Sequence, residues 1–273
     1  MPTMSDLGRL GETHRVRGNY VEAERLLRAT VVMAEAATPR DDLGLAAALN
    51  GLGLLCKDLA KYDEARALYG RALSLLEGAP GYHDAWIATI YHNLGGIEHA
   101  SGNFAEGEPF ARRGLAIRRQ LDGADDALAA DMAALAAILD GQQKQDEAES
   151  LYRDALRIYE RSPESNAGEI AVTLNGLGAL YATRGSLEEA EAILTRALSL
   201  KQETLGPRHP DVAVTLNNLA LVYKRQGEFT RAATLYLDAV DILEHLLGAE
   251  HPKAVICREN YTRCVADARA SDA

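Results

Sequence analysis

The chain has 273 residues, a formal net charge of −11 at pH 7 and only 5% aromatic residues. The acidic balance argues against a phosphate-rich partner, whether nucleic acid or an anionic membrane surface. The scarcity of aromatic residues argues against a β-sandwich or barrel, because strands favour β-branched and aromatic side chains.

No targeting or membrane segment is expected. The first residues, Met1 to Asp6, lack the basic stretch and apolar run of a secretory signal. The longest apolar stretch, Ala127 to Leu139, is interrupted by Asp131 and is shorter than the roughly 18 residues of a membrane span. Three cysteines without a CxxC spacing make no disulfide framework, so the sequence predicts a cytoplasmic protein.

Six leucines recur at steps of 41 or 42 residues, and we use them as the anchors of a repeat. A small residue follows each anchor directly, a glycine stands eight residues after four of them, and an aromatic residue stands ten residues after four. This order predicts a first helix, a tight turn at the glycine and a second helix in each repeat. The anchors are Leu10, Leu52, Leu94, Leu135, Leu177 and Leu219.

Thirteen helices follow from this pattern. They are expected near residues 4–17, 20–37, 42–59, 62–77, 83–100, 104–121, 125–141, 145–161, 167–183, 187–204, 210–226, 229–247 and 252–270.

The order small-x6-Gly-x-aromatic-x2-Ala-x6-Ala resembles the tetratricopeptide repeat (TPR). The segment from Leu205 to Tyr223 narrows the resemblance to the 42-residue repeat of kinesin light chains, which many bacterial proteins also carry. An Ala-rich composition with more Arg than Lys agrees with a bacterial source. The resemblance implies an all-α fold, a right-handed α-solenoid (superhelix) of helix-turn-helix repeats that forms one domain over residues 1–273.

Six repeats are expected near 4–41, 42–82, 83–124, 125–166, 167–209 and 210–251. Residues 252–270 supply only the first helix of a seventh repeat, and its many charged residues suit a capping helix at the end of the array.

The third and fourth repeats depart from the pattern. Gly107 and Gly114 replace alanine in a helix, at roughly 0.5–1 kcal/mol each, and Pro109 lies between them. Gln143 and Gln145 replace the turn glycine and the aromatic residue. We therefore expect residues 95–145 to exchange amide hydrogens faster than residues 170–245, through tolerated drift or because they form a hinge or docking site.

The resemblance also implies that the first helices line an inner, peptide-binding surface. Asparagines recur there, and their amides can pair with both the N–H and C=O groups of an extended peptide. Lys224, Arg225 and Arg263 add positive charge, so an acidic segment is the expected ligand. The alternative is that the asparagines bridge neighbouring helices. The candidate peptide-binding residues are Asn50, Asn93, Asn175, Asn217, Asn218, Lys224, Arg225, Asn260 and Arg263.

No catalytic, metal or cofactor site is expected. His92 and His99 are seven residues apart on one helix, about 10 Å along its axis, which is too far for both to bind one zinc ion. Cys257 and Cys264 have the same spacing and fit packing positions instead. No phosphate-binding glycine loop follows a strand pattern.

A basic cluster, Arg112, Arg113, Arg118 and Arg119, lies on the second helix of the third repeat. We expect it to be a solvated outer face that pairs with nearby carboxylates, with a second docking surface as the alternative.

The sequence therefore predicts a non-enzymatic scaffold or adaptor that binds an extended segment of a partner protein. Two alternatives stay open. The first is an oligomerisation or structural module, in which the chain associates with itself. The second is a ligand-sensing regulatory domain, in which the third and fourth repeats move.

Overall fold

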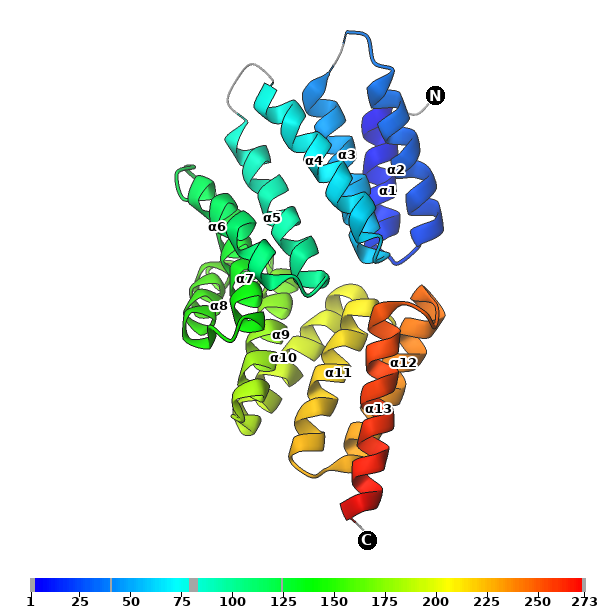
Figure 1. Cartoon of the computed structure of the whole chain (residues 1–273), viewed down its shortest axis with the longest axis vertical. Coiled ribbons are helices and arrows are strands. Elements are labelled where there is room, and N and C mark those ends of the chain that lie inside the picture. Colours follow the sequence, from blue (N-terminus) through cyan, green and yellow to red (C-terminus); the bar gives the residue numbers. More distant parts are fainter. Residues whose placement is uncertain (1–2, 40, 79–82, 124, 272–273) are drawn as a thin grey trace. The chain divides into compact units, whose positions relative to one another are not determined.

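The computed structural model describes residues 3–39, 41–78, 83–123 and 125–271, and all regular structure in these ranges is helical (Figure 1). Thirteen helices lie within the described ranges: α1 (Met4–Val16), α2 (Tyr20–Glu35), α3 (Asp42–Asp58), α4 (Tyr62–Gly78), α5 (Asp84–Ala100), α6 (Phe104–Arg118), α7 (Asp125–Gly141), α8 (Gln145–Tyr159), α9 (Ala167–Arg184), α10 (Leu187–Leu205), α11 (Pro210–Arg225), α12 (Phe229–Leu247) and α13 (Pro252–Ser271).

Each predicted helix is present, and no end differs from its prediction by more than three residues. The predicted repeat boundaries at residues 82 and 124 lie outside the described residues. None of the described helices combines the length and apolarity that a membrane crossing requires.

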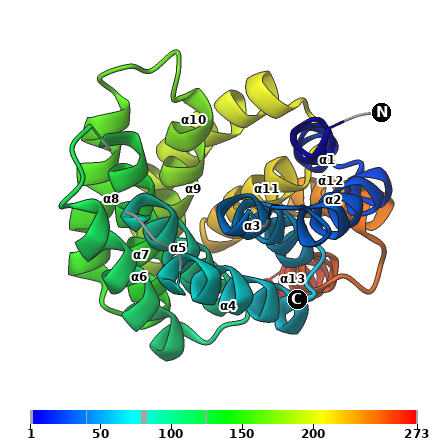
Figure 2. The ribbon, with the colours of Figure 1, turned by 90° about the horizontal axis from the view of Figure 1, so that it is seen from above.

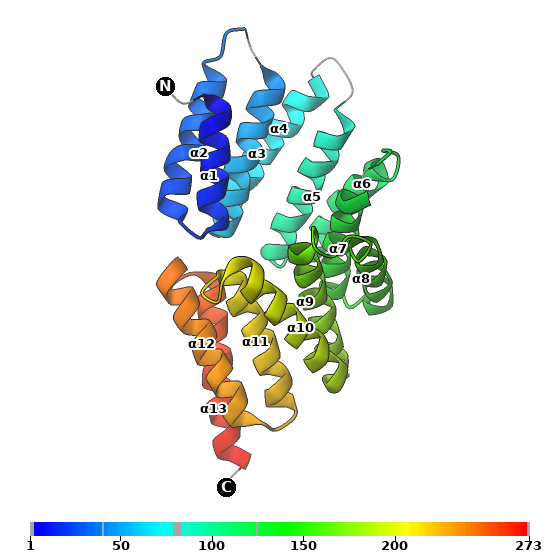
Figure 3. The same cartoon turned by 180° about the vertical axis from the view of Figure 1, so that it is seen from behind.

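The chain divides into two compact units, Met1–Lys144 and Gln145–Ala273. The N-terminal unit holds α1 to α7 and the C-terminal unit holds α8 to α13. In the N-terminal unit α3 packs against both α2 and α4 (Figure 2). In the C-terminal unit α12 packs against α11 and α13 (Figure 3). The prediction of a single domain stays a prediction.

The turn between the two helices of a repeat has one conformation throughout. Gly18, Gly102, Gly185 and Gly227 all have a positive φ, between 76° and 92°. Ala60 and Gln143 stand at the equivalent positions and also adopt positive φ, 57° and 63°. The left-handed conformation costs a residue with a Cβ atom about 1–2 kcal/mol, so packing of the helix pair imposes this turn even where glycine is absent.

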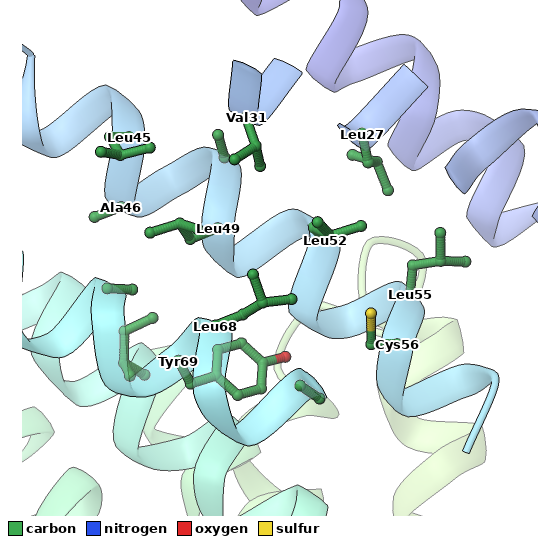
Figure 4. Close-up of a cluster of buried hydrophobic side chains, with 14 of the residues drawn as sticks. Leu27, Val31, Leu45, Ala46, Leu49, Leu52, Leu55, Cys56, Leu68 and Tyr69 are labelled. Carbon is green, nitrogen blue, oxygen red and sulfur yellow. The ribbon is translucent and has the colours of Figure 1, made fainter. Parts of the chain in front are cut away.

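Leucine anchors fill the core between successive repeats. In Figure 4, Leu27 and Val31 of α2 face Leu49 and Leu52 of α3 within one buried cluster. The five later anchors are all buried, whereas Leu10, on the first described helix, is exposed.

The small residue after each anchor is required by close helix packing. A Cβ atom on Gly53 would lie 2.6 Å from the Tyr69 ring, and one on Gly178 would lie 2.6 Å from Leu194 Cγ. The same reason applies to the unusual glycines of α6. A Cβ atom on Gly114 would lie 3.1 Å from the Ala88 carbonyl oxygen. These glycines therefore serve packing, and the faster exchange of residues 95–145 stays a prediction.

Candidate functional site

Three positions of each first helix lie on the same side of that helix. They are five residues before the anchor leucine, two residues before it and two residues after it. This spacing of three and four residues places them on one helical face, which we call the first-helix face. In the N-terminal unit, α1, α2 and α3 line a half-open cavity of about 470 Å³ at this face. Its lining includes Ser5, Gly8 and Glu12 of α1, Leu27 and Thr30 of α2, and Ala47, Asn50 and Leu54 of α3.

Small residues create this cavity, and few of its polar groups are free. Gly8 and Gly51 place no side chain in it. The Thr30 hydroxyl donates to the Leu26 carbonyl oxygen at 2.9 Å. The Glu12 carboxylate accepts two hydrogen bonds from Arg15, at 2.8 and 2.7 Å. The cavity is therefore a mainly apolar hollow, and the Ser5 hydroxyl and the Asn50 amide are its polar groups that are least engaged within the described residues.

The predicted asparagines pair with one another. In the N-terminal unit, the buried Asn93 donates its Nδ2 to Asn50 Oδ1 at 2.7 Å. The amide nitrogen of Asn50 itself has no hydrogen-bond partner within the described residues. Asn93 stands one residue before its anchor, Leu94, and Asn50 stands two residues before the preceding anchor, Leu52.

The C-terminal unit repeats this pairing twice and joins the two pairs. Asn218 Nδ2 donates to Asn175 Oδ1 at 3.2 Å, and Asn260 Nδ2 donates to Asn217 Oδ1 at 3.0 Å. Asn217 Nδ2 lies 3.4 Å from Asn218 Oδ1 and completes a chain of four amides across α9, α11 and α13. The bridging role of the asparagines is thus present in the structure. Each amide has two donor hydrogens and two acceptor lone pairs, so every member keeps capacity for a ligand.

The three predicted cations have different environments. Lys224 Nζ pairs with Asp267 Oδ2 at 2.7 Å. Arg225 donates to the carbonyl oxygens of Ala182 and Thr183, which lie near the end of α9. Arg263 is exposed and has no ion pair within the part of the chain that the structure describes. Arg263 is therefore the predicted cation whose charge is most open to a ligand.

The prediction of a solvated face was wrong for Arg118, which is only 7% exposed. Its Nε donates to Asp131 Oδ2 at 3.0 Å, and its Nη2 donates to Thr89 Oγ1 at 3.1 Å. Asp131, 3% exposed, also bonds to His92 Nδ1 through its other oxygen at 2.8 Å. This triad of the buried Arg118 and Asp131 with the partly exposed His92 joins α5, α6 and α7. Arg112 keeps the predicted behaviour and pairs with Glu108 at 2.8 Å.

Arg118 stands 24 residues after its anchor, a position that is buried in every repeat. The equivalent residues are Ala34, Leu76, Tyr159, Lys201 and Leu243. The other four repeats have uncharged residues at this position. That pattern was the signal that could have identified Arg118 and Lys201 as buried cations. Lys201 Nζ donates to the Asp211 carbonyl oxygen at 3.2 Å. Burial lowers the pKa of Lys201 to about 8, although the nearby Asp211 charge raises it.

Groups that could support catalysis are dispersed or protected. No cluster of three or more His, Cys, Asp or Glu side chains within the described ranges is arranged to hold a metal ion. Cys56, Cys257 and Cys264 are free and buried, and burial raises the pKa of Cys257 to about 11. Since the thiolate is the reactive form, Cys257 is a poor nucleophile near neutral pH.

Comparison with known proteins gives one family. Residues 4–78, 86–161 and 169–245 match the family model described as tetratricopeptide repeat. No curated protein matches the chain in sequence.

Several solved structures share the fold. BtubC (BKLC) from P. vanneervenii is 24% identical with a TM-score of 0.59, over 86% of this chain and 92% of that chain. A putative kinesin light chain of Podosopora anserina with nearly identical TPR-like repeats is 18% identical with a TM-score of 0.51, over 72% and 94%. A Rap protein complexed with Competence and Sporulation Factor is 14% identical with a TM-score of 0.67, over 98% and 76%. The predicted fold class, an all-α repeat solenoid, is confirmed.

Proposed function

Because the chain belongs to the tetratricopeptide repeat family, as its repeat pattern predicted, we propose that it is a non-enzymatic scaffold that holds an extended segment of a partner protein. The segment lies along the first-helix face and pairs its main-chain groups with the asparagine amides. The observation that carries this proposal is the chain of four amides in the C-terminal unit, each with unused hydrogen-bonding capacity.

Charge supports an acidic residue in the bound segment. Arg263 is exposed near the asparagine chain and has no carboxylate partner among the described residues. A carboxylate of the partner would form a charge-assisted, bidentate pair with its guanidinium group. A structural neighbour of similar fold, the Rap protein, is described in complex with Competence and Sporulation Factor, which makes ligand binding by such a fold reasonable here.

The test is capture of partners from a lysate on the immobilised full chain, with Arg263→Glu as the variant. Arg269→Glu is the matched control, because Arg269 is also exposed on α13 and lies six residues further on. A partner retained by the wild type and by Arg269→Glu, but lost with Arg263→Glu, is the expected result. Equal retention by all three proteins would place the binding site elsewhere.

Self-association is the second candidate, and the outer face of α2 favours it. Val21 is 89% exposed and Val32 is 64% exposed. The other complete repeats carry Asp63, Ala105, Asp146, Glu188 and Thr230 at the first position, and Ser74, Ala116, Arg157, Ser199 and Asp241 at the second.

Sedimentation at several protein concentrations separates the two candidates. An average mass that rises with concentration in the wild type, and not in Val21→Asp/Val32→Ser, would favour self-association. These replacements use residues that the chain itself carries at equivalent positions, so the helix should tolerate them.

A further inference from the structure

The C-terminal unit carries a second row of side chains beside the asparagine chain. Val172, Val214 and Ile256 lie on the first helices α9, α11 and α13, at steps of 42 residues. Val172 is 56% exposed, Ile256 is 53% exposed and Val214 is half-buried. We call these three residues the aliphatic row.

The aliphatic row is specific to this unit. The equivalent positions of α1, α3, α5 and α7 in the N-terminal unit hold Ser5, Ala47, Thr89 and Ala130. The fold therefore accepts small or polar residues at this position. Exposed aliphatic side chains that recur on one face, where packing does not require them, indicate a contact surface.

The row and the asparagines share the first-helix face. Val172 precedes Asn175 by three residues, and Val214 precedes Asn217 by three, so each pair lies on the same side of its helix. The helix α11 packs against both α9 and α13, and the asparagine bonds cross the same two contacts. The aliphatic row and the asparagine chain therefore run side by side across three neighbouring helices.

We propose that this double row selects an extended segment with an aliphatic side chain at every third residue, an inference that rests on the proposed function. Packed helices lie about 8–10 Å apart. A polyproline II segment advances about 3.1 Å per residue and returns to the same side every third residue, so it advances about 9.3 Å between equivalent side chains. One aliphatic side chain of the ligand then meets each member of the row.

Main-chain complementarity identifies the ligand as extended. The asparagine amides offer donors and acceptors in alternation, and a polyproline II segment leaves its N–H and C=O groups unbonded. An α-helical ligand uses those groups internally. The unpaired Arg263 is on α13, seven residues after Ile256, so it favours an acidic residue at the end of the segment that meets α13.

Two synthetic peptides of equal composition test the spacing. Each is a fluorescein-labelled decapeptide of serine with three valines and a C-terminal aspartate. In the first the valines occupy the second, fifth and eighth positions, and in the second they occupy the second, fourth and sixth. Fluorescence anisotropy with the full chain should give at least tenfold tighter binding of the first peptide.

Variants then assign the effect to the row. Val172→Thr/Val214→Thr/Ile256→Thr replaces the row with the residue type that Thr89 already supplies at this position, and it should remove the preference between the peptides. Leu237→Thr is the matched control, because Leu237 is an exposed aliphatic residue on the second helix α12, and it should keep the preference. Circular dichroism confirms that both variants are folded.

The other results are distinguishable. If both peptides bind equally and the triple variant binds them as the wild type does, the aliphatic row is not a contact and this inference fails, while the scaffold proposal stands. If neither peptide binds, the aliphatic row does not select this pattern and the inference fails, while the scaffold proposal is decided by the capture experiment with Arg263→Glu.

Discussion

Asn260 donates its side-chain amide to Oδ1 of Asn217, 43 residues earlier in the chain, at 3.0 Å. The same relationship joins Asn218 to Asn175 and Asn93 to Asn50. The step is one residue longer than the 42-residue repeat. Asn93 and Asn218 each stand one residue before an anchor, and Asn260 stands one residue before Tyr261, which is 42 residues after Leu219. Each acceptor stands two residues before the preceding anchor. These side chains therefore fix adjacent first helices to each other.

Replacing Asn260 with alanine should lower the free energy of unfolding by about 1 kcal/mol, the usual net value of such a hydrogen bond. Urea denaturation of the full chain measures this loss. Glu259→Ala is the control, since Glu259 is exposed and has no hydrogen bond within the described residues. An equal loss in both variants would show that the Asn260 bond adds nothing.

Replacing Arg118 with leucine should cost about 3–5 kcal/mol, because it leaves the buried Asp131 without its guanidinium partner. The double variant Arg118→Leu/Asp131→Ile should recover most of the loss. The two new residues are those that the chain already has one repeat earlier. There Leu76 is equivalent to Arg118 and Ile90 is equivalent to Asp131, and both are buried. Thermal unfolding of the three proteins gives the comparison, and a single variant as stable as the wild type would contradict it.

Replacing Lys201 with leucine, as in the equivalent Leu243, should stabilise the protein by about 2–3 kcal/mol at pH 7. The pKa of Lys201 is lowered from 10.5 to about 8 in the folded state. Between these values the unfolded chain binds the proton and the folded chain does not, so wild-type stability rises with pH across that range.

The advantage of Lys201→Leu should therefore be constant below about pH 8 and shrink toward pH 10.5. Urea titrations at pH 7, 8.5 and 10 measure it. An advantage that grows as the pH rises would show that burial does not disfavour the charged amine.

His251 immediately precedes α13, and its Nδ1 accepts a hydrogen bond from the Lys253 main-chain N–H at 3.2 Å. His251→Ala should lower stability by about 1 kcal/mol, whereas His251→Asn should lose less because asparagine also caps helices. The fraction unfolded in urea, followed by circular dichroism, distinguishes the two variants. A greater loss with asparagine than with alanine would exclude the capping role.

The helices were predictable because their signals are local. An anchor leucine, the small residue after it and a turn glycine recur at fixed spacing. Each of them determines the structure of only the few residues around it. The asparagine positions were predictable for the same reason. That they could bridge neighbouring helices was also foreseen as an alternative. The partner of each was not predictable, because the choice between Asn217 and Asn218 as the partner of Asn260 depends on how neighbouring helices are offset.

The burial of Arg118 was missed for a different reason. Arg118 was interpreted with its sequence neighbours Arg112, Arg113 and Arg119 as a surface cluster. Comparison with Leu76 and Tyr159, at the same position of other repeats, would have indicated burial. In a repeat protein the equivalent residues of other repeats are more informative about burial than the adjacent residues.

The left-handed turns at Ala60 and Gln143 show that the helix pair, and not glycine, sets the turn. Each of these residues holds a backbone shape that glycine would adopt without strain. The array thus contains two turns that keep the left-handed conformation without the glycine that four other repeats have there. Restoring glycine at both is a direct route to a more heat-resistant scaffold that leaves the first-helix face untouched.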